Sequence, residues 1–190
     1  MHIRTWLAVA ASVVITFQAN AAMAQQMREA PVSPSANTQI EIAFTPDENA
    51  LGKILAAISK ARRDIRVQAY VFTDRTLARA LIRAHRRGLA VEVIVDQNKV
   101  EDNGAPRAIE LAAAGVPVFV DGLHAAAHNK IILIDAGSNE PVVITGSYNF
   151  TVAAQSKNAE NLLLIRGDRR IAAAYSRNWA SHRGHATRIQ

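Results

Sequence analysis

Two apolar segments with polar residues at their ends most constrain how this chain can fold. The segments Lys130–Asp135 and Pro141–Thr145 are rich in β-branched and apolar residues, as buried strands are. Side chains two positions apart on a strand lie on the same face. If the two strands pair, an imidazole, an ammonium, a hydroxyl and a carboxamide meet at one rim of a sheet. They belong to His128, Lys130, Ser147 and Asn149.

This set of groups suits chemistry on a phosphodiester. Lys130 supplies a positive charge and Asn149 supplies N–H donors for the phosphate oxygens. A neutral His128 can attack phosphorus and form a covalent phosphohistidine, which divides one difficult step into two. A second imidazole, in its protonated form, would donate a proton to the leaving oxygen as the general acid. Glu160 is a candidate for a carboxylate that fixes the tautomer of the attacking ring.

Each of these residues taken singly has a structural interpretation. A lone His or Lys on a strand is usually a solvated side chain. Asp135 suits a turn at the end of a strand, and Gly146-Ser147 is a common turn sequence. The functional interpretation depends on the order and spacing of the whole set.

The pattern His128-x-Lys130-x4-Asp135, followed by Gly146-Ser147-Tyr148-Asn149, resembles the signature of the phospholipase D superfamily. The stretch from His128 to Ile165 is most similar to the small, single-motif branch typified by the Nuc endonuclease. This resemblance implies a mixed α/β fold and hydrolysis of phosphodiesters without a metal or other cofactor.

The resemblance also implies a role for each residue of the motif. The implied catalytic set is His128 as nucleophile, Lys130, Asp135 in a supporting role, and Glu160 as the carboxylate that orients the histidine. The implied phosphate-binding set is Lys130, Ser147 and Asn149. The segment between Asp135 and Gly146 is a few residues longer than in that branch, and its composition predicts an extended hairpin loop.

The motif occurs once in the chain. Family members with two copies build one site from both, so a single copy implies a homodimer in which two His128 residues face each other across a twofold axis. One histidine would be the nucleophile and the other the general acid. Twofold pairing is the commonest oligomer geometry.

The N-terminal residues have the pattern of a secretory signal peptide. Arg4 precedes an apolar core, Trp6–Phe17, and Ala22-Met23-Ala24 is a cleavage pattern that places the cut before Gln25. Cleavage after Ala21 and an uncleaved anchor are alternatives. The pattern predicts a periplasmic or secreted protein with no stable membrane insertion after cleavage. Residues 25–37 are expected to be a flexible leader, and residues 38–190 a single catalytic domain.

Alternating strand and helix patterns predict a mixed, largely parallel sheet flanked by helices on both faces. Helices are predicted at 47–63, 73–87, 105–114 and 168–182. Strands are predicted at 40–44, 65–72, 89–95, 116–120, 130–134, 142–145 and 162–165.

The charge of the chain favours a polyanionic substrate. Residues 1–24 contain one Arg and no acid, so removing them changes the formal charge from +6 to +5. Basic chains attract nucleic acids through counterion release, although Arg residues at helix ends also have a structural role. Aromatic residues are few, which predicts little sequence preference.

The spacing of the histidines offers two possible metal-binding pairs, His124 with His128 and His182 with His185. No Cys or carboxylate cluster evident from the sequence completes either pair. We therefore expect no metal.

Three functions remain open from the sequence. The first is a metal-independent, non-specific endonuclease that hydrolyses DNA or RNA as a homodimer. The second is a lipid phosphodiesterase acting on phosphatidylcholine or cardiolipin, against which no amphipathic or aromatic membrane-binding stretch is found. The third is a DNA-binding protein that keeps the fold without catalysis.

Overall fold

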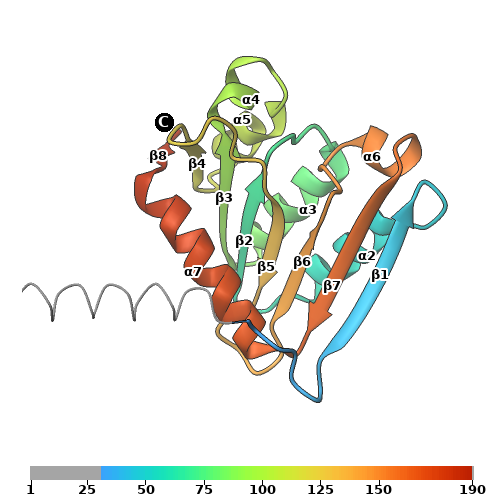
Figure 1. The fold of residues 1–190 in the computed structure, drawn as a ribbon. Coiled ribbons are helices and arrows are strands. Elements are labelled where there is room, and N and C mark those ends of the chain that lie inside the picture. Colours follow the sequence, from blue (N-terminus) through green and yellow to red (C-terminus); the bar gives the residue numbers. More distant parts are fainter. Residues whose placement is uncertain (1–30, 190) are drawn as a thin grey trace, which may run out of the picture. The chain divides into compact units, whose positions relative to one another are not determined.

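The computed structural model describes residues 31–189. Within this range eight strands form one sheet in the order β1-β7-β6-β5-β2-β3-β4-β8 (Figure 1). In chain order the strands are β1 (Gln39–Thr45), β2 (Asp64–Ala69), β3 (Ala90–Asp96), β4 (Val118–Asp121), β5 (Lys130–Ile134), β6 (Val142–Gly146), β7 (Glu160–Arg166) and β8 (Thr187–Arg188).

The sheet is mixed, as predicted, but it is not largely parallel. Only the β2–β3 and β3–β4 pairings are parallel, and the other five are antiparallel. Parallel neighbours need a long crossover, which the helices after β2 and β3 supply. The connection from β5 to β6 is the seven-residue loop 135–141, which is too short for a crossover and so joins antiparallel neighbours.

Helices cover both faces of the sheet, which confirms that part of the prediction (Figure 1). One face carries α2 (Ala50–Lys60), α3 (Arg75–Arg86) and α5 (Pro106–Ala113), and the other carries α7 (Arg169–His185). Two short helices, α4 (Gln97–Glu101) and α6 (Val152–Ser156), and strand β8 were not predicted, because such short elements have weak sequence patterns.

Strand β5 runs through the middle of the core, and all five of its residues are buried. Ile131 and Leu133 pack in the cluster that contains Trp179 of α7, whereas Ile132 and Ile134 pack on the side of the other helices. Burial on both faces explains why the segment is continuously apolar instead of alternating.

The helix starts follow local side-chain chemistry. Asn49, Asp74 and Asp168 each accept a hydrogen bond from a backbone N–H in the first turn of the helix that follows. Helix α3, predicted over 73–87, begins directly after its Asp74 cap. Gly88, just after α3, has φ +91°, a conformation that glycine adopts readily.

The predicted signal peptide lies outside the described residues, as does the leader up to residue 30. The folded unit begins at Pro34, a few residues before the predicted domain start. Asp168 accounts for the difference, because it accepts hydrogen bonds from the Ser35 N–H at 2.6 Å and from the Thr38 hydroxyl at 2.7 Å. In the described part of the chain, every helix is too short or too polar to cross a membrane.

Candidate active site

Antiparallel pairing brings the polar ends of three strands to one rim. Strand β5 starts at this rim, β6 ends there and β7 starts there, because each runs opposite to its neighbour. The rim therefore gathers residues that are distant in sequence. They are His128 and Lys130 at the start of β5, Ser147 and Asn149 after β6, and Glu160 at the start of β7.

His128 and Lys130 form the centre of this rim. The His128 side chain is exposed, whereas Lys130 is only 7% exposed. The Lys130 ammonium lies 2.9 Å from Nδ1 of His128 and donates to the His128 carbonyl oxygen at 2.8 Å. An ammonium held so close to the imidazole is placed to bind the oxygens of any phosphate that the ring attacks.

Tyr70, which the sequence analysis did not single out, lies beneath both groups. Its ring centroid is 4.2 Å from that of His128 and 4.8 Å from the Lys130 ammonium. The Tyr70 N–H donates to the carbonyl oxygen of Asn129 at 2.9 Å. The aromatic ring therefore supports the imidazole by packing and the ammonium by a cation–π interaction. In the sequence, only the position of Tyr70 near the end of the predicted strand 65–72 could have indicated that it belongs to the site.

Burial lowers the pKa of Lys130 to about 8, and the negative charge of Glu160 only partly opposes this effect. The ammonium is poorly solvated, so a bound anion would replace interactions that burial has removed. The buried ammonium is therefore suited to bind an anion.

Ser147 and Glu160 form a separate hydrogen-bonded unit. The Ser147 hydroxyl donates to Glu160 Oε2 at 2.6 Å and accepts from the Asn161 N–H at 3.0 Å. The other carboxylate oxygen, Oε1, accepts from the Asn158 amide at 3.0 Å. The carboxylate thus contacts the serine rather than the His128 ring that the sequence analysis expected it to orient.

Gly146 permits this arrangement. Its φ is +146°, and a Cβ atom at this position would lie 2.3 Å from the backbone oxygen of Asn161. The absence of a side chain lets β6 end close against β7, where the Ser147 N–H donates to the same Asn161 oxygen at 3.1 Å.

Asn149 has an unusual environment. Its Oδ1 atom is buried and has no hydrogen-bond partner among the described residues. A buried amide that is not fully paired is costly, and such groups are often completed by a ligand. Because Oδ1 is an acceptor, this unpaired atom does not bear on the N–H donation to phosphate that the sequence predicts for Asn149, which stays a prediction.

Asp135 lies apart from the other residues of the motif, at the opposite end of β5. Its carboxylate accepts backbone N–H groups of Arg62, Arg63 and Asp64 at 2.7 to 3.2 Å, and its own φ is +51°. The geometry places it in the structural role of holding the turn before β2 and does not support its inclusion among the catalytic residues. The longer loop after Asp135 is at this far end too, so it leaves access to His128 open.

A pocket of about 390 Å³ opens beside His128. Helix α7 forms one wall of it through Ala174, Tyr175 and Asn178, which the sequence analysis did not identify. The remaining lining residues belong to the strand ends and are His128, Asn129, Lys130, Ile131, Thr145 and Gly146. A larger hollow of about 1210 Å³ lies near Asp135 at the far rim, away from the imidazole.

Comparison with known proteins identifies the family. Residues 54–183 match the family model described as "Cardiolipin synthase, PLD-like domain". The chain belongs to the phospholipase D superfamily. A phospholipase D from Rickettsia prowazekii is 37% identical over 152 residues, which cover 80% of this chain and 71% of that protein. Members of this superfamily hydrolyse phosphodiesters, and this chain is such a hydrolase.

Two other relatives support this assignment. The mitochondrial cardiolipin hydrolase of Xenopus tropicalis is 34% identical over 132 residues, which cover 70% of this chain and 60% of that protein. The crystal structure of Nuc, a phospholipase D family member from Salmonella typhimurium, has a TM-score of 0.75 and 28% identity, and the match covers 81% of this chain and 99% of that one. These likenesses also argue against a DNA-binding protein without catalysis.

Proposed function

We propose that this protein is an endonuclease that hydrolyses DNA or RNA through a covalent phosphohistidine, in a site completed by a second copy of the chain. One observation carries the proposal. The exposed imidazole of His128 stands beside the buried ammonium of Lys130 in an open pocket lined by both polar and apolar groups. Such a pocket admits the backbone of a long polyanion, and the net charge of +6 attracts one.

In the first step a ring nitrogen of His128 attacks phosphorus. A P–N bond forms, the bond from phosphorus to the leaving oxygen breaks, and that oxygen takes a proton from the His128 imidazolium of the second copy. In the second step water loses a proton to that imidazole and attacks phosphorus. The P–N bond breaks and the first His128 is regenerated.

The neighbouring residues stabilise the charge that develops on phosphorus. The Lys130 ammonium, beside the attacking ring, donates to the phosphate oxygens, the Asn149 amide N–H groups are assigned the same role from the sequence motif, and the Ser147 hydroxyl lies at the same rim. Glu160 acts as a positioning residue, because it fixes Ser147 and its charge favours the protonated form of Lys130. No step requires a metal at this site.

The proposed homodimer rests on two features, the single motif and the exposure of His128. It can be tested by purifying heterodimers with two different tags, one wild-type protomer and one His128→Ala protomer. If both imidazoles are needed for each turnover, the heterodimer falls below about 1% of wild-type activity. Retention of half the activity, or a monomer by light scattering, would contradict the shared site.

A lipid phosphodiesterase is the second candidate, and the relatives named phospholipase D and cardiolipin hydrolase favour it. The chemistry on phosphorus would be the same. We place nucleic acid first because the chain carries a net charge of +6, which favours a long polyanion over a lipid with a single headgroup.

The deciding assay compares supercoiled plasmid with vesicles of cardiolipin and of phosphatidylcholine, all in excess EDTA. The proteins are wild type, His128→Ala and, as a control, Glu140→Ala, an exposed residue on the turn at the far rim. Circular dichroism confirms that each protein remains folded. We expect nicking by wild type and the control alone. Lipid hydrolysis without nicking by the folded wild type would refute the nuclease and establish the second candidate.

We also propose that the protein acts in the periplasm or outside the cell, which rests on the signal-peptide pattern of residues 1–24. Cell fractionation with N-terminal sequencing of the product tests this. A mature N-terminus at Gln25 in the periplasmic fraction is expected, and an intact N-terminus in the cytosol would contradict it.

A further inference from the structure

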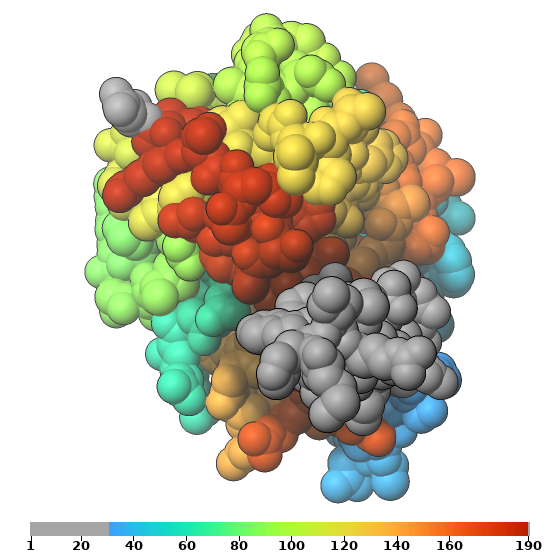
Figure 2. Space-filling view, turned by 60° about the vertical axis from the view of Figure 1, so that its left-hand side comes forward, coloured from blue at the N-terminus to red at the C-terminus, as the bar shows by residue number. Residues whose placement is uncertain are grey.

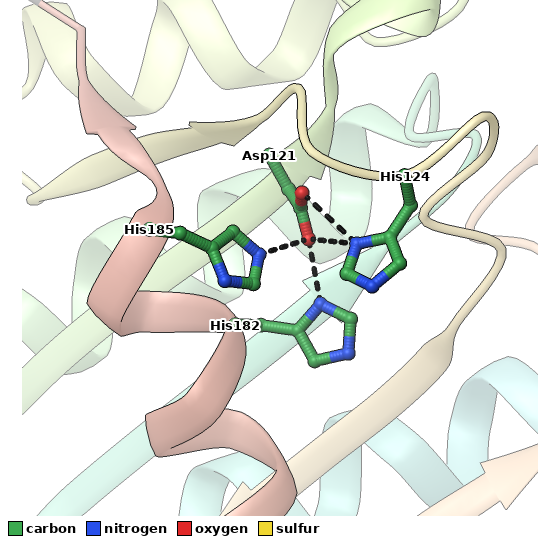
Figure 3. Close-up of side chains that lie close together, drawn as sticks. All are labelled: Asp121, His124, His182 and His185. Atoms are coloured by element: carbon green, nitrogen blue, oxygen red, sulfur yellow. Dashed lines mark hydrogen bonds and ion pairs between the residues drawn. The ribbon is translucent and has the colours of Figure 1, made fainter.

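Outside the active site, four side chains that could bind a metal converge at the end of β4 (Figure 3). Asp121 is the last residue of β4, His124 lies in the loop that follows, and His182 and His185 lie on α7. The two α7 histidines are three residues apart and so lie on one face of the helix. The sequence analysis paired His124 with His128, but the structure places His124 with the α7 histidines instead.

The distances within this cluster fit one ion. Asp121 Oδ2 lies 2.6 Å from His182 Nδ1 and 3.2 Å from His185 Nε2, and Asp121 Oδ1 lies 3.2 Å from His124 Nδ1. All four donor atoms lie within 4.8 Å of one another. In a tetrahedral zinc site with ligand bonds near 2.0 to 2.1 Å, the ligand atoms are about 3.3 Å apart. Small side-chain movements would therefore bring these atoms to coordinating positions.

The burial of the four side chains also favours a bound cation. The Asp121 side chain is fully buried, and those of His182 and His185 are 12% and 25% exposed. The buried His185 Nε2 atom lies 3.2 Å from Asp121 Oδ2 but forms no hydrogen bond within residues 31–189. A buried carboxylate ringed by nitrogen donors suits a divalent cation.

We propose that Asp121, His124, His182 and His185 bind one Zn²⁺ ion that clamps the C-terminal end of α7 to the end of β4. Imidazole and carboxylate are ligands that zinc prefers, and the absence of cysteine argues against a site for Cu(I). The chain itself supplies all four ligands, which is typical of a structural rather than a catalytic ion.

This clamp would hold two walls of the active site. The loop that contains His124 leads directly to His128, and α7 lines the pocket through Tyr175 and Asn178. The C-terminal segment also contacts β4 through the two paired residues of β8, Thr187 and Arg188. The Ile189 N–H donates to the Val118 carbonyl oxygen at 2.9 Å, and the Arg183 guanidinium lies 3.4 Å from the centroid of the Phe119 ring. Figure 2 shows the red C-terminal helix lying against the yellow loop on the surface of the molecule.

The first test measures metal content in protein purified without a polyhistidine tag. We expect about one zinc per protomer by mass spectrometry. Chelated protein that is then supplied with ZnCl₂ should melt roughly 10 °C higher than the metal-free form, if zinc is present at about a thousandfold over its dissociation constant. Zinc below a tenth of an equivalent, together with an unchanged melting temperature, would overturn the proposal and leave only a hydrogen-bonded network.

Alanine variants of the cluster histidines test which residues bind the zinc ion. His124 has the most exposed side chain of the four, 45%, so His124→Ala should fold. We expect it to lose more than about 100-fold in zinc affinity, as measured by competition with a chromophoric chelator. Co²⁺ substitution should give the visible absorption of a tetrahedral site, and this signal should vanish in His185→Ala. His85→Ala, outside the cluster, is the matched control. An unchanged zinc affinity in both cluster variants would refute the assignment, as would a preference for another metal.

Discussion

Replacing Lys130 with methionine should make the protein more stable while abolishing its activity. Burial lowers the pKa of this lysine from its usual 10.5 to about 8, so the folded state disfavours the charge by about 2.5 pKa units, or about 3.4 kcal/mol at most. Methionine fills a similar volume without charge. It also loses the interactions of the ammonium with the His128 carbonyl oxygen and the His128 ring, which together contribute about 1 to 2 kcal/mol. We therefore expect a net gain of about 2 kcal/mol at pH 7.

The gain should depend on pH in a defined direction. A lysine with a lowered pKa binds fewer protons in the folded than in the unfolded state between pH 8 and pH 10.5. The cost of the buried charge is therefore complete below pH 8 and disappears above pH 10.5. At pH 9.5 the largest possible cost has fallen from about 3.4 to about 1.4 kcal/mol, so most of the stabilisation should be lost there.

Urea unfolding followed by circular dichroism at pH 7.0 and pH 9.5 measures this effect, with zinc held constant. Lys60→Met, at an exposed position, is the control and should change the free energy of unfolding by less than about 0.5 kcal/mol. The reasoning is refuted if Lys130→Met is less stable than wild type at pH 7, or if its advantage is the same at both pH values.

Three further results are expected. Gly146→Ala should destabilise the protein by about 2 kcal/mol or more and reduce activity, because the added Cβ meets the Asn161 carbonyl; normal melting temperature and turnover would contradict this. Asp135→Ala should cost about 2 to 4 kcal/mol in urea titrations yet leave kcat within about threefold, because it frees backbone N–H groups far from His128. The activity of wild type should fall as pH rises through about 8, and Lys130→Arg should move this limb of the pH profile upward, if it retains activity, because arginine stays charged. If the fall in activity stays near pH 8 in Lys130→Arg, a group other than Lys130 causes it.

The local patterns of the sequence predicted most of the elements and the family. Strand β5 was predicted with its observed bounds, because burial on both faces leaves a continuous apolar run. Helix α3 was predicted because Thr73 and Asp74 are both capping residues and Gly88 is a stop signal, and the structure shows Asp74 as the cap. The balance of parallel and antiparallel strands was predicted wrongly, since strand order depends on which elements pack together over long distances in the chain.

The same division applies to the functional residues. Spacing alone indicated His128, Lys130, Ser147 and Asn149, because neighbours on one strand and its turn have fixed relative positions. The spacing did not indicate that Asp135 lies at the other end of the strand, where its carboxylate accepts hydrogen bonds from three backbone N–H groups.

Contacts between distant segments were decided only by the tertiary structure. Glu160 was expected beside an imidazole and instead pairs with Ser147 across β6 and β7. The cluster of Asp121 with His182 joins residues 61 positions apart, and no periodicity in the sequence links them. The sequence determines which chemical groups are present and how neighbouring groups point. Which distant groups meet depends on the order of the strands and on the face that each helix covers, and these are set by burial of the whole core.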